Sequence, residues 1–207
     1  LKADNIQDAD GNNIINESSN TITIGASGDT ISIPSGATIA NSGTATGFGG
    51  ITMADQWRLT ADNSMSSSGN QDITSNWERN DNSGFGQLGS GMTESSGIFT
   101  FPSTGIYLIK IVFDVIAGGS SGADIAADVK INTTVNNSDY TQQTATYASM
   151  HGNGVYSVGM AEFIFDVTDT STHKCKFRYY RSTSGSILRG STSQNETHAT
   201  FIRLGDT

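Results

Sequence analysis

Residues 96–116 read SGIFTFPSTGIYLIKIVFDVI, and the second half of this stretch indicates the fold class. Every second residue after Gly105 is apolar, namely Tyr107, Ile109, Ile111, Phe113 and Val115. The positions between them mix apolar residues with Lys110 and Asp114. Because successive side chains of a strand point to opposite faces, the pattern predicts one long strand over 106–116 with a buried face and a half-apolar outer face. Such a strand suits a β-sandwich whose outer surface is partly covered by another subunit.

The corner before this strand has its own local chemistry. Pro102 fixes φ and ends a strand near 97–101, Gly105 permits a positive φ, and Tyr107 begins the next strand with its ring inward. Similar alternation predicts strands at 55–61, 73–79, 97–101, 105–117, 125–135, 141–149, 155–167, 173–182 and 198–204. No segment has a convincing helical pattern. The chain is therefore predicted to be all-β, with a jelly-roll sandwich as a head domain in residues 51–207.

The stretch from Gly97 to Tyr107 resembles the signature Gly-x-Phe-x-x-Pro-x-x-Gly-x-Tyr of the tumour-necrosis-factor-like (TNF-like) fold, in the form found in the globular head of the first complement component. The segment 198–205 is similar to the last central strand of that fold. The resemblance implies a jelly roll that assembles as a compact homotrimer and recognises partners through loops at its outer end. The residues expected in the head core are Phe99, Phe101, Tyr107, Ile109, Ile111, Phe113, Phe163, Phe165, Cys175 and Phe177.

The first 50 residues carry a different pattern, in which short Ile-x-Ile units recur between Gly-containing turns. Ordering one nine-residue unit costs about 9–18 kcal/mol of backbone entropy, whereas burying its two isoleucines returns only about 3–6 kcal/mol. Identical copies are expected to supply the missing burial. The pattern thus predicts an intertwined trimeric β-stalk over 1–50, with a glycine-rich hinge at 43–50; a flexible linker is the alternative. The expected stalk core is Ile22, Ile24, Ile31, Ile33 and Ile39.

The segment from Ile6 to Phe48 is also similar to stretches in tail-fibre and appendage proteins of marine bacteriophages. In those proteins, short β-repeats form a trimeric shaft that ends in a small knob. The order in this chain, a repeat segment and then a globular head, agrees with that arrangement. The resemblance implies a bacteriophage virion appendage that contacts other virion proteins and a glycan or protein of the host cell surface.

Composition narrows the classes of function. Of the 207 residues, 11 are Lys or Arg and 20 are Asp or Glu, which gives a net charge of −9. This charge repels nucleic-acid phosphates and anionic membranes, so nucleic-acid binding is not expected. No run approaches the ~18–20 apolar residues that cross a bilayer, so membrane insertion is not expected either. The single cysteine, Cys175, excludes an internal disulfide and a zinc cluster built on cysteines.

Signals for catalysis or metal binding are weak. The three histidines, His151, His173 and His198, accompany no Gly-x-Ser-x-Gly elbow, and no pair of carboxylates suggests glycoside hydrolysis. Asp8 and Asp10 echo the start of a calcium loop, although a polar turn explains them more simply. A calcium ion on the three-fold axis stays an alternative without an assignable ligand. No enzymatic activity, cofactor or metal site is predicted.

The long polar loop 182–195, together with Trp77, Tyr140 and His151, offers the aromatic and hydrogen-bonding groups that the recognition of a saccharide or protein uses. The candidate receptor-binding residues are Trp77, Tyr140, His151, Arg189 and Asn195. A place in the core or in a subunit interface is the competing interpretation for Trp77. His151 lies in the segment 150–154, whose composition is typical of a hairpin turn.

These features together predict a non-enzymatic, homotrimeric tip of a bacteriophage fibre, located on the virion, that attaches to the host surface through three identical heads. Two alternatives stay open. One is a purely structural head that directs trimerisation or decorates the particle without binding a receptor. The other is a tip that degrades surface polysaccharide.

Overall fold

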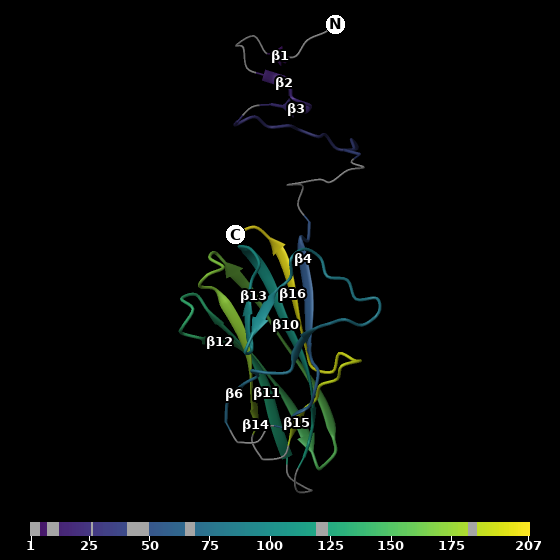
Figure 1. Ribbon diagram of the computed structural model, residues 1–207, viewed down its shortest axis with the longest axis vertical. Coiled ribbons are helices and arrows are strands. Elements are labelled where there is room, and N and C mark those ends of the chain that lie inside the picture. Colours follow the sequence, from purple (N-terminus) through teal and green to yellow (C-terminus); the bar gives the residue numbers. More distant parts are fainter. Residues whose placement is uncertain are drawn as a thin grey trace. The chain divides into compact units, whose positions relative to one another are not determined.

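The computed structural model describes residues 5–7, 13–25, 27–40, 50–64, 69–118, 124–181 and 186–207 (Figure 1). Every regular element in these residues is a β-strand, so the prediction of an all-β fold is confirmed. The chain divides into two compact units, residues 1–47 and 48–207. Asp8, Asp10 and all of the expected hinge except Gly50 lie outside the described residues.

The N-terminal unit contains a small antiparallel sheet of three strands. These are β1 (Asn5–Gln7), β2 (Asn13–Ser18) and β3 (Thr21–Ile24). The hairpin between β2 and β3 turns at Ser19 and Asn20, whose φ angles are 51° and 65°. Two consecutive positive φ values suit the tight type I′ turn, whose twist matches that of the flanking strands.

The isoleucines of this unit are exposed within one chain. Cross-strand pairing aligns Ile6 with Ile15 and Ile15 with Ile24, which places a row of isoleucines across one face of the sheet. The five isoleucines expected in the stalk core have exposed fractions from 47% to 68%. One chain by itself therefore leaves this apolar surface in water.

Of the two Ile-x-Ile units, only the first forms a strand. Ile22 and Ile24 lie in β3, but Ile31, Ile33 and Ile39 lie in described segments that form no strand. Pro34 follows directly after Ile33 and has no amide proton to donate to a ladder. Isolated strands also need a neighbour, and the described part of the chain offers these isoleucines none.

The head consists of two antiparallel sheets that lie face to face (Figure 1). The seven-stranded sheet contains β4 (Met53–Leu59), β5 (Asn63–Ser64), β7 (Trp77–Arg79), β10 (Gly105–Ile116), β13 (Tyr156–Val167), β15 (Ile187–Leu188) and β16 (His198–Gly205). The six-stranded sheet contains β6 (Gln71–Asp72), β8 (Thr93–Ser95), β9 (Ile98–Thr100), β11 (Asp124–Thr134), β12 (Thr141–His151) and β14 (Lys174–Arg181). Within the seven-stranded sheet, β10 pairs with β13 on one side and with β16 on the other, and β4 and β7 continue beyond β16.

Each of the nine predicted head segments overlaps an observed strand. The prediction missed β5, β6, β8 and β15, because strands of two or three residues form only where tertiary packing holds them. The hairpin predicted at 150–154 is wrong. The flanking strands β12 and β13 belong to different sheets, so this segment carries the chain from one layer of the sandwich to the other.

The corner at Pro102 and Gly105 forms as predicted. Gly105 has a φ of 143°, and a Cβ at this position would lie 2.6 Å from the carbonyl oxygen of Gly205, so only glycine fits. The ring of Tyr107 points inward, and its hydroxyl donates a hydrogen bond to the backbone oxygen of Ser103 at 2.9 Å. This bond closes the corner and fixes the start of β10.

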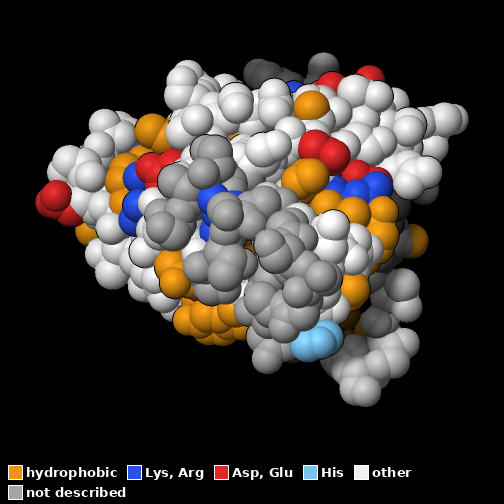
Figure 2. Space-filling view, turned by 90° about the horizontal axis from the view of Figure 1, so that it is seen from below, with side chains coloured by type: hydrophobic (Ala, Val, Ile, Leu, Met, Phe, Trp, Pro, Cys, Tyr) orange, Lys and Arg blue, Asp and Glu red, His pale blue; other side chains and the backbone are white. Residues whose placement is uncertain are grey.

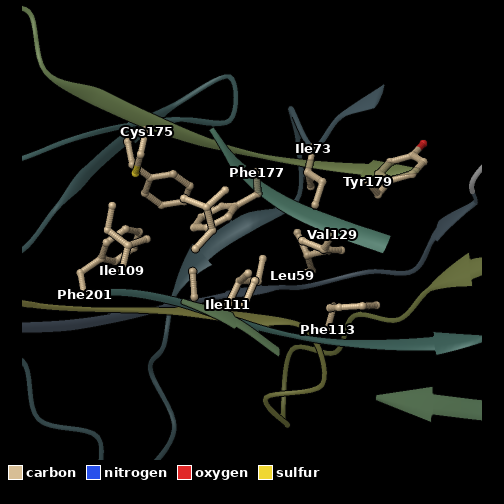
Figure 3. Close-up of a cluster of buried hydrophobic side chains, with 14 of the residues drawn as sticks. Leu59, Ile73, Ile109, Ile111, Phe113, Val129, Cys175, Phe177, Tyr179 and Phe201 are labelled. Carbon is tan, nitrogen blue, oxygen red and sulfur yellow. The ribbon is translucent and has the colours of Figure 1, made fainter. Parts of the chain in front are cut away.

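The hydrophobic core lies between the two sheets (Figure 3). Nine of the ten residues expected there are buried, and Phe163 is partly buried against them. Phe163 lies on β13, which has a strand neighbour on one side only. Figure 3 shows side chains of both sheets, such as Phe177 and Ile111, meeting in this layer. One face of the seven-stranded sheet therefore packs against the core, and its opposite face is directed outward.

Candidate functional site: an apolar outer face of the head

The outward side of the seven-stranded sheet carries a large group of apolar side chains. Cross-strand pairing places Ile202, Leu108 and Ile164 in one row and Val112 beside Met160 in another. We use the name apolar face for the outward side chains of β10, β13 and β16 that are apolar: Ile106, Leu108, Val112, Ile116, Tyr156, Val158, Met160, Ile164 and Ile202.

The β13 part of the apolar face is the most exposed. Tyr156, Val158, Met160 and Ile164 have exposed fractions of 59%, 64%, 49% and 59%. They alternate along β13, an end strand of 12 residues in the seven-stranded sheet. A long, flat, apolar edge strand promotes association, and natural proteins normally cover it or interrupt it with charges. Here the outward alternation is interrupted only by Glu162 before it ends at Asp166.

One polar row crosses the apolar face. Lys110 of β10 lies opposite Glu162 of β13 and opposite Thr200 of β16. Opposite charges at directly opposed positions of an antiparallel pair attract, so this row is close to neutral. The face is therefore mainly apolar with a compensated pair at its centre.

A shallow hollow of about 200 Å³ adjoins the apolar face at β4 and β16. Its walls include Ala54, Thr200 and Ile202 of the sheet and Phe85 of the loop that follows β7. The hollow therefore extends the apolar surface from β13 across the sheet toward β4. Asp55 lines the hollow as well, so its wall is not purely apolar.

His198 borders the apolar face at the start of β16. It lies opposite Val112 on one side and opposite Arg58 on the other. Its Nδ1 lies 3.1 Å from the backbone oxygen of Asn195. Because a carbonyl oxygen only accepts, Nδ1 carries the proton of the neutral ring. Burial lowers the pKa of His198; hydrogen bonds to the carbonyl groups of Glu196 and Asn195 oppose this shift, and nearby Lys110 adds to it.

Arg189, a candidate receptor-binding residue, is engaged at the margin of the apolar face. Its Nη1 donates to Asp114 at 2.9 Å, its Nη2 pairs with Glu196, and its guanidinium lies 5.1 Å from the ring centre of Tyr156. Burial alone would lower the pKa of Arg189, but the carboxylates of Glu196 and Asp114 outweigh burial and raise it. The guanidinium is thus held in place on the margin of the face.

The other four receptor-binding candidates are dispersed over the head. Asn195 donates through its amide to Gln56, which also lies on the outward side of β4. Trp77 packs at the edge of the core, with its ring centre 5.2 Å from that of Phe99. Tyr140 lies over Lys176 on the six-stranded sheet, and His151 is an exposed residue at the end of β12. The structure therefore brings Arg189 and Asn195 to the margin of the apolar face and leaves Trp77, Tyr140 and His151 elsewhere.

The sequence alone indicates only part of the apolar face. The outward positions of β10 were recognised as half apolar. The outward positions of β13, Tyr156, Val158 and Met160, were not singled out, because Ser157 and Gly159 between them break the apolar alternation of the inward side. The outward side chains of β13 and those of β10 come together only when the two strands pair.

Charges at the lower end of the head occur as neighbouring pairs. Seen from that end, basic and acidic side chains lie close together in two groups, and further basic side chains lie between these groups (Figure 2). Two such pairings in the head are Lys176 with Asp72 at 2.8 Å and Arg189 with Asp114 at 2.9 Å. Asp72 also pairs with Arg178 at 2.6 Å, so two cations share this carboxylate.

The described residues contain no group of three or more His, Cys, Asp and Glu side chains that could hold a metal ion. Burial raises the pKa of the Cys175 thiol far above its usual value, so the thiol stays protonated and unreactive in the folded head. In the same described segments, no helix has the length and apolarity to cross a bilayer.

Comparisons with known proteins bear on the fold. No protein-family model and no characterised protein matches the sequence. A structure of murine APRIL at pH 8.0 aligns with 73% of this chain and 98% of its own, at 12% identity and a TM-score of 0.50. Murine APRIL at pH 5.0 aligns over the same shares at 14% identity and a TM-score of 0.50. Eiger TNF from S. frugiperda aligns with 75% of this chain and 94% of its own, at 11% identity and a TM-score of 0.49.

The likeness to APRIL covers almost the whole of that chain, and it shows the fold. The expectation of a TNF-like jelly roll is thereby confirmed for the head. At 12–14% identity the likeness carries no statement about partners or activity.

Proposed function

We propose that this chain is a homotrimeric, non-enzymatic appendage of a virus particle, in which the apolar face joins three heads. The exposed apolar side chains of β13 and their continuation over β10 and β16 support this proposal. A monomeric head would keep this surface in water. The choice of three copies follows from the resemblance of the head to TNF-like domains and of the N-terminal segment to trimeric phage shafts.

Energetics require the whole face to be covered. Burying the exposed halves of the four β13 side chains stabilises a complex by roughly 3–6 kcal/mol. Association costs about 4–15 kcal/mol in lost translational and rotational freedom. β13 alone is therefore insufficient, and the side chains of β10 and β16 and the hollow at Phe85 belong to the same interface.

The isoleucines of the N-terminal unit also lack cover within one chain. Ile22, Ile24, Ile31, Ile33 and Ile39 are all exposed in one chain. Three parallel chains would bring each isoleucine pair against two copies of itself. The N-terminal unit then acts as a stalk that keeps the heads together.

Attachment to the host surface is the role that this arrangement serves best. Three identical heads multiply weak contacts, because linked sites raise the overall affinity by about 10²–10⁴ over one site. Arg189 and Asn195, at the margin of the apolar face, remain the receptor-contact candidates, whereas Trp77 is occupied by core packing. The proposal places the protein on the virion, where other virion proteins hold its N-terminal end.

The test is whether the apolar face is shielded in the full chain. Val158→Asp puts a charge on this face and is expected to open it, which makes the thioether of neighbouring Met160 react with hydrogen peroxide several-fold faster. Val135→Asp is the matched control, since Val135 is 61% exposed and follows β11 in the other sheet. A wild-type chain whose Met160 already reacts as fast as in the Val158→Asp variant would contradict the proposed interface.

Binding to host cells tests the attachment step. Fluorescently labelled wild-type chain is expected to bind cells of the host, and the Val158→Asp variant to bind much more weakly because it lacks avidity. A fully assembled wild-type protein that binds no host cells would instead favour the purely structural head.

A further inference from the structure

A buried lysine of the six-stranded sheet lies within reach of both a side-chain amide and a carboxylate. Nζ of Lys130, on β11, donates to Oδ1 of Asn70 and to Oδ1 of Asp128, each at 2.6 Å. The side chains of Lys130 and Asp128 are only 10% and 2% exposed. An amine, an amide carbonyl and a proton acceptor therefore meet at one shielded point, although Asn70 and Lys130 lie 60 positions apart in the chain.

The strands hold these three groups in place. Asn70 directly precedes β6, and β6 pairs with β14 beside β11. Asp128 and Lys130 are two positions apart on β11, so both side chains point to the same side of the sheet. The Lys130 amine also lies over the ring of Tyr180, 5.2 Å from the ring centre. The amine is thus confined next to the amide, as a reaction between positioned groups requires.

The atoms that would react are close to each other. The C=O bond of an amide is about 1.23 Å long, so Cγ of Asn70 lies at most about 3.8 Å from Nζ of Lys130. Reacting atoms form bonds from separations of about 3–3.5 Å. A movement of less than about 1 Å by the end of the lysine side chain therefore brings its nitrogen onto the amide carbon.

We propose that Lys130 and Asn70 form an isopeptide bond, an amide between two side chains, with Asp128 as the proton acceptor. The Lys130 ammonium gives one proton to the Asp128 carboxylate, and the neutral Nζ attacks Cγ of Asn70. The Nζ–Cγ bond forms, a second amine proton moves to Nδ2, the Cγ–Nδ2 bond breaks and ammonia leaves. The third proton stays on the new amide nitrogen, and no atom is oxidised or reduced.

Burial favours the product of this reaction. The starting groups hold an ammonium and a carboxylate in a shielded site, whereas the product holds a neutral amide and a protonated Asp128 that donates a hydrogen bond to it. A buried charge costs more than a buried, hydrogen-bonded neutral group. Ammonia escapes into the solvent, so the reverse reaction lacks its co-reactant. The bond ties the segment before β6 to β11 within one chain and needs no partner copy.

Mass spectrometry of the denatured full-length chain provides the test. Wild type is expected to weigh about 17 Da less than its sequence, because the amine displaces one ammonia. Trypsin requires a free lysine amine, so it should not cut after Lys130 and should leave a branched peptide that contains both Asn70 and Lys130. This peptide distinguishes the bond from a succinimide at Asn153–Gly154, which also releases ammonia.

Two variants and a matched control assign the roles of the residues. Lys130→Arg keeps the cation without the lysine nucleophile, and Asp128→Asn keeps the shape but cannot take the proton. Both should therefore have the full mass of their sequences. Lys176→Arg is the control, because Lys176 lies on the neighbouring strand β14 and pairs with Asp72 at 2.8 Å. It should lose ammonia as wild type does, and circular dichroism should confirm that each variant is folded.

Two results from the wild-type chain would overturn the inference. One is a folded chain of full mass that trypsin cuts after Lys130, and the other is a loss of ammonia without the branched peptide. An Asp128→Asn variant that links as completely as wild type would overturn the role of Asp128. If a variant fails to fold, the mass and the peptides of wild type still decide whether the bond exists.

Discussion

At the scale of single residues, the two sheets approach closely where a glycine leaves room for a neighbouring side chain. Gly159 on β13 lies opposite Phe113, and a Cβ built there would lie 2.4 Å from two atoms of the Phe113 ring and 3.2 Å from the Thr146 methyl group. Phe113 is fully buried, so its ring has little room to move.

Gly159→Ala is therefore expected to lower the free energy of unfolding by about 1–3 kcal/mol, the usual cost of overpacking a core. Gly205→Ala is the control, because a Cβ there has no atom within 4 Å. Urea unfolding of both variants measures the difference. Equal stability of the two variants would show that the β12–β13 edge is looser than described.

The buried thiol gives a second prediction at this scale. Cys175 is fully buried, and burial raises its pKa, so the reactive thiolate is scarce at every pH near neutrality. A thiol reagent such as dithionitrobenzoate should react with the folded protein only at the rate of unfolding and at once in urea. Rapid reaction of the native protein would mean that β14 opens locally.

At the scale of elements, one buried carboxylate joins several segments. Asp55 of β4 accepts hydrogen bonds from the indole N–H of Trp57 at 2.9 Å and from the backbone N–H of Met92 at 2.7 Å, and it pairs with Arg79 of β7 at 3.0 Å. Its exposed fraction is 2%. These bonds tie β4 to β7 and to the segment that leads into β8.

Asp55→Ala should destabilise the head by about 3–5 kcal/mol, because it leaves buried donors and a cation uncompensated. Asp206→Ala removes the exposed partner of Arg203 and should cost at most about 1 kcal/mol. Thermal or urea unfolding compares the two. Similar losses would mean that the Asp55 cluster is hydrated rather than closed.

The exposed isoleucines of the N-terminal unit can be tested by substitution. Ile24→Asp together with Ile33→Asp places charges on the exposed isoleucine surface and should dissolve the stalk association, since the apolar contact between copies is lost. Proteolysis of the N-terminal 50 residues measures this, because a dissociated stalk is cut faster than an assembled one. Unchanged protection in the double variant would mean that the isoleucines meet no partner.

The sequence predicted strands well where the alternation of apolar and polar residues continued over many residues. The alternation from Ile106 to Ile116 predicted β10, and the Pro102–Gly105 corner formed as expected. The Ile31–Ile33 unit has the same local alternation but forms no strand, because a strand needs a neighbour that the described chain does not provide. The crossover at 150–154 was misjudged because turn residues indicate a turn without indicating which sheet the next strand joins.

The site was harder to predict than the fold. Tyr156 and Met160 lie 40 or more positions after the strand that they extend, so their alignment with Ile116 and Val112 exists only in the paired sheet. Arg189 was singled out for its charge, but the structure shows it held by Asp114 and Glu196. Both the apolar face and the ion pairs of Arg189 depend on partners that are distant in the sequence.

At the scale of the whole molecule, two units carry apolar surface that one chain does not cover. The head exposes the apolar face, and the N-terminal unit exposes its isoleucines. Either surface alone gives a modest gain on association, but copies joined at one surface raise the effective concentration at the other. Assembly of the full chain is therefore expected to be tighter than that of either unit.

The central claim is that identical copies meet to cover these surfaces. Light scattering of the full-length chain on a size-exclusion column at about pH 8, well above the reference pKa of histidine, tests it most directly. The account predicts a mass three times that of the 21.8 kDa chain, unchanged on dilution across the accessible range. A mass equal to one chain at every concentration would contradict it.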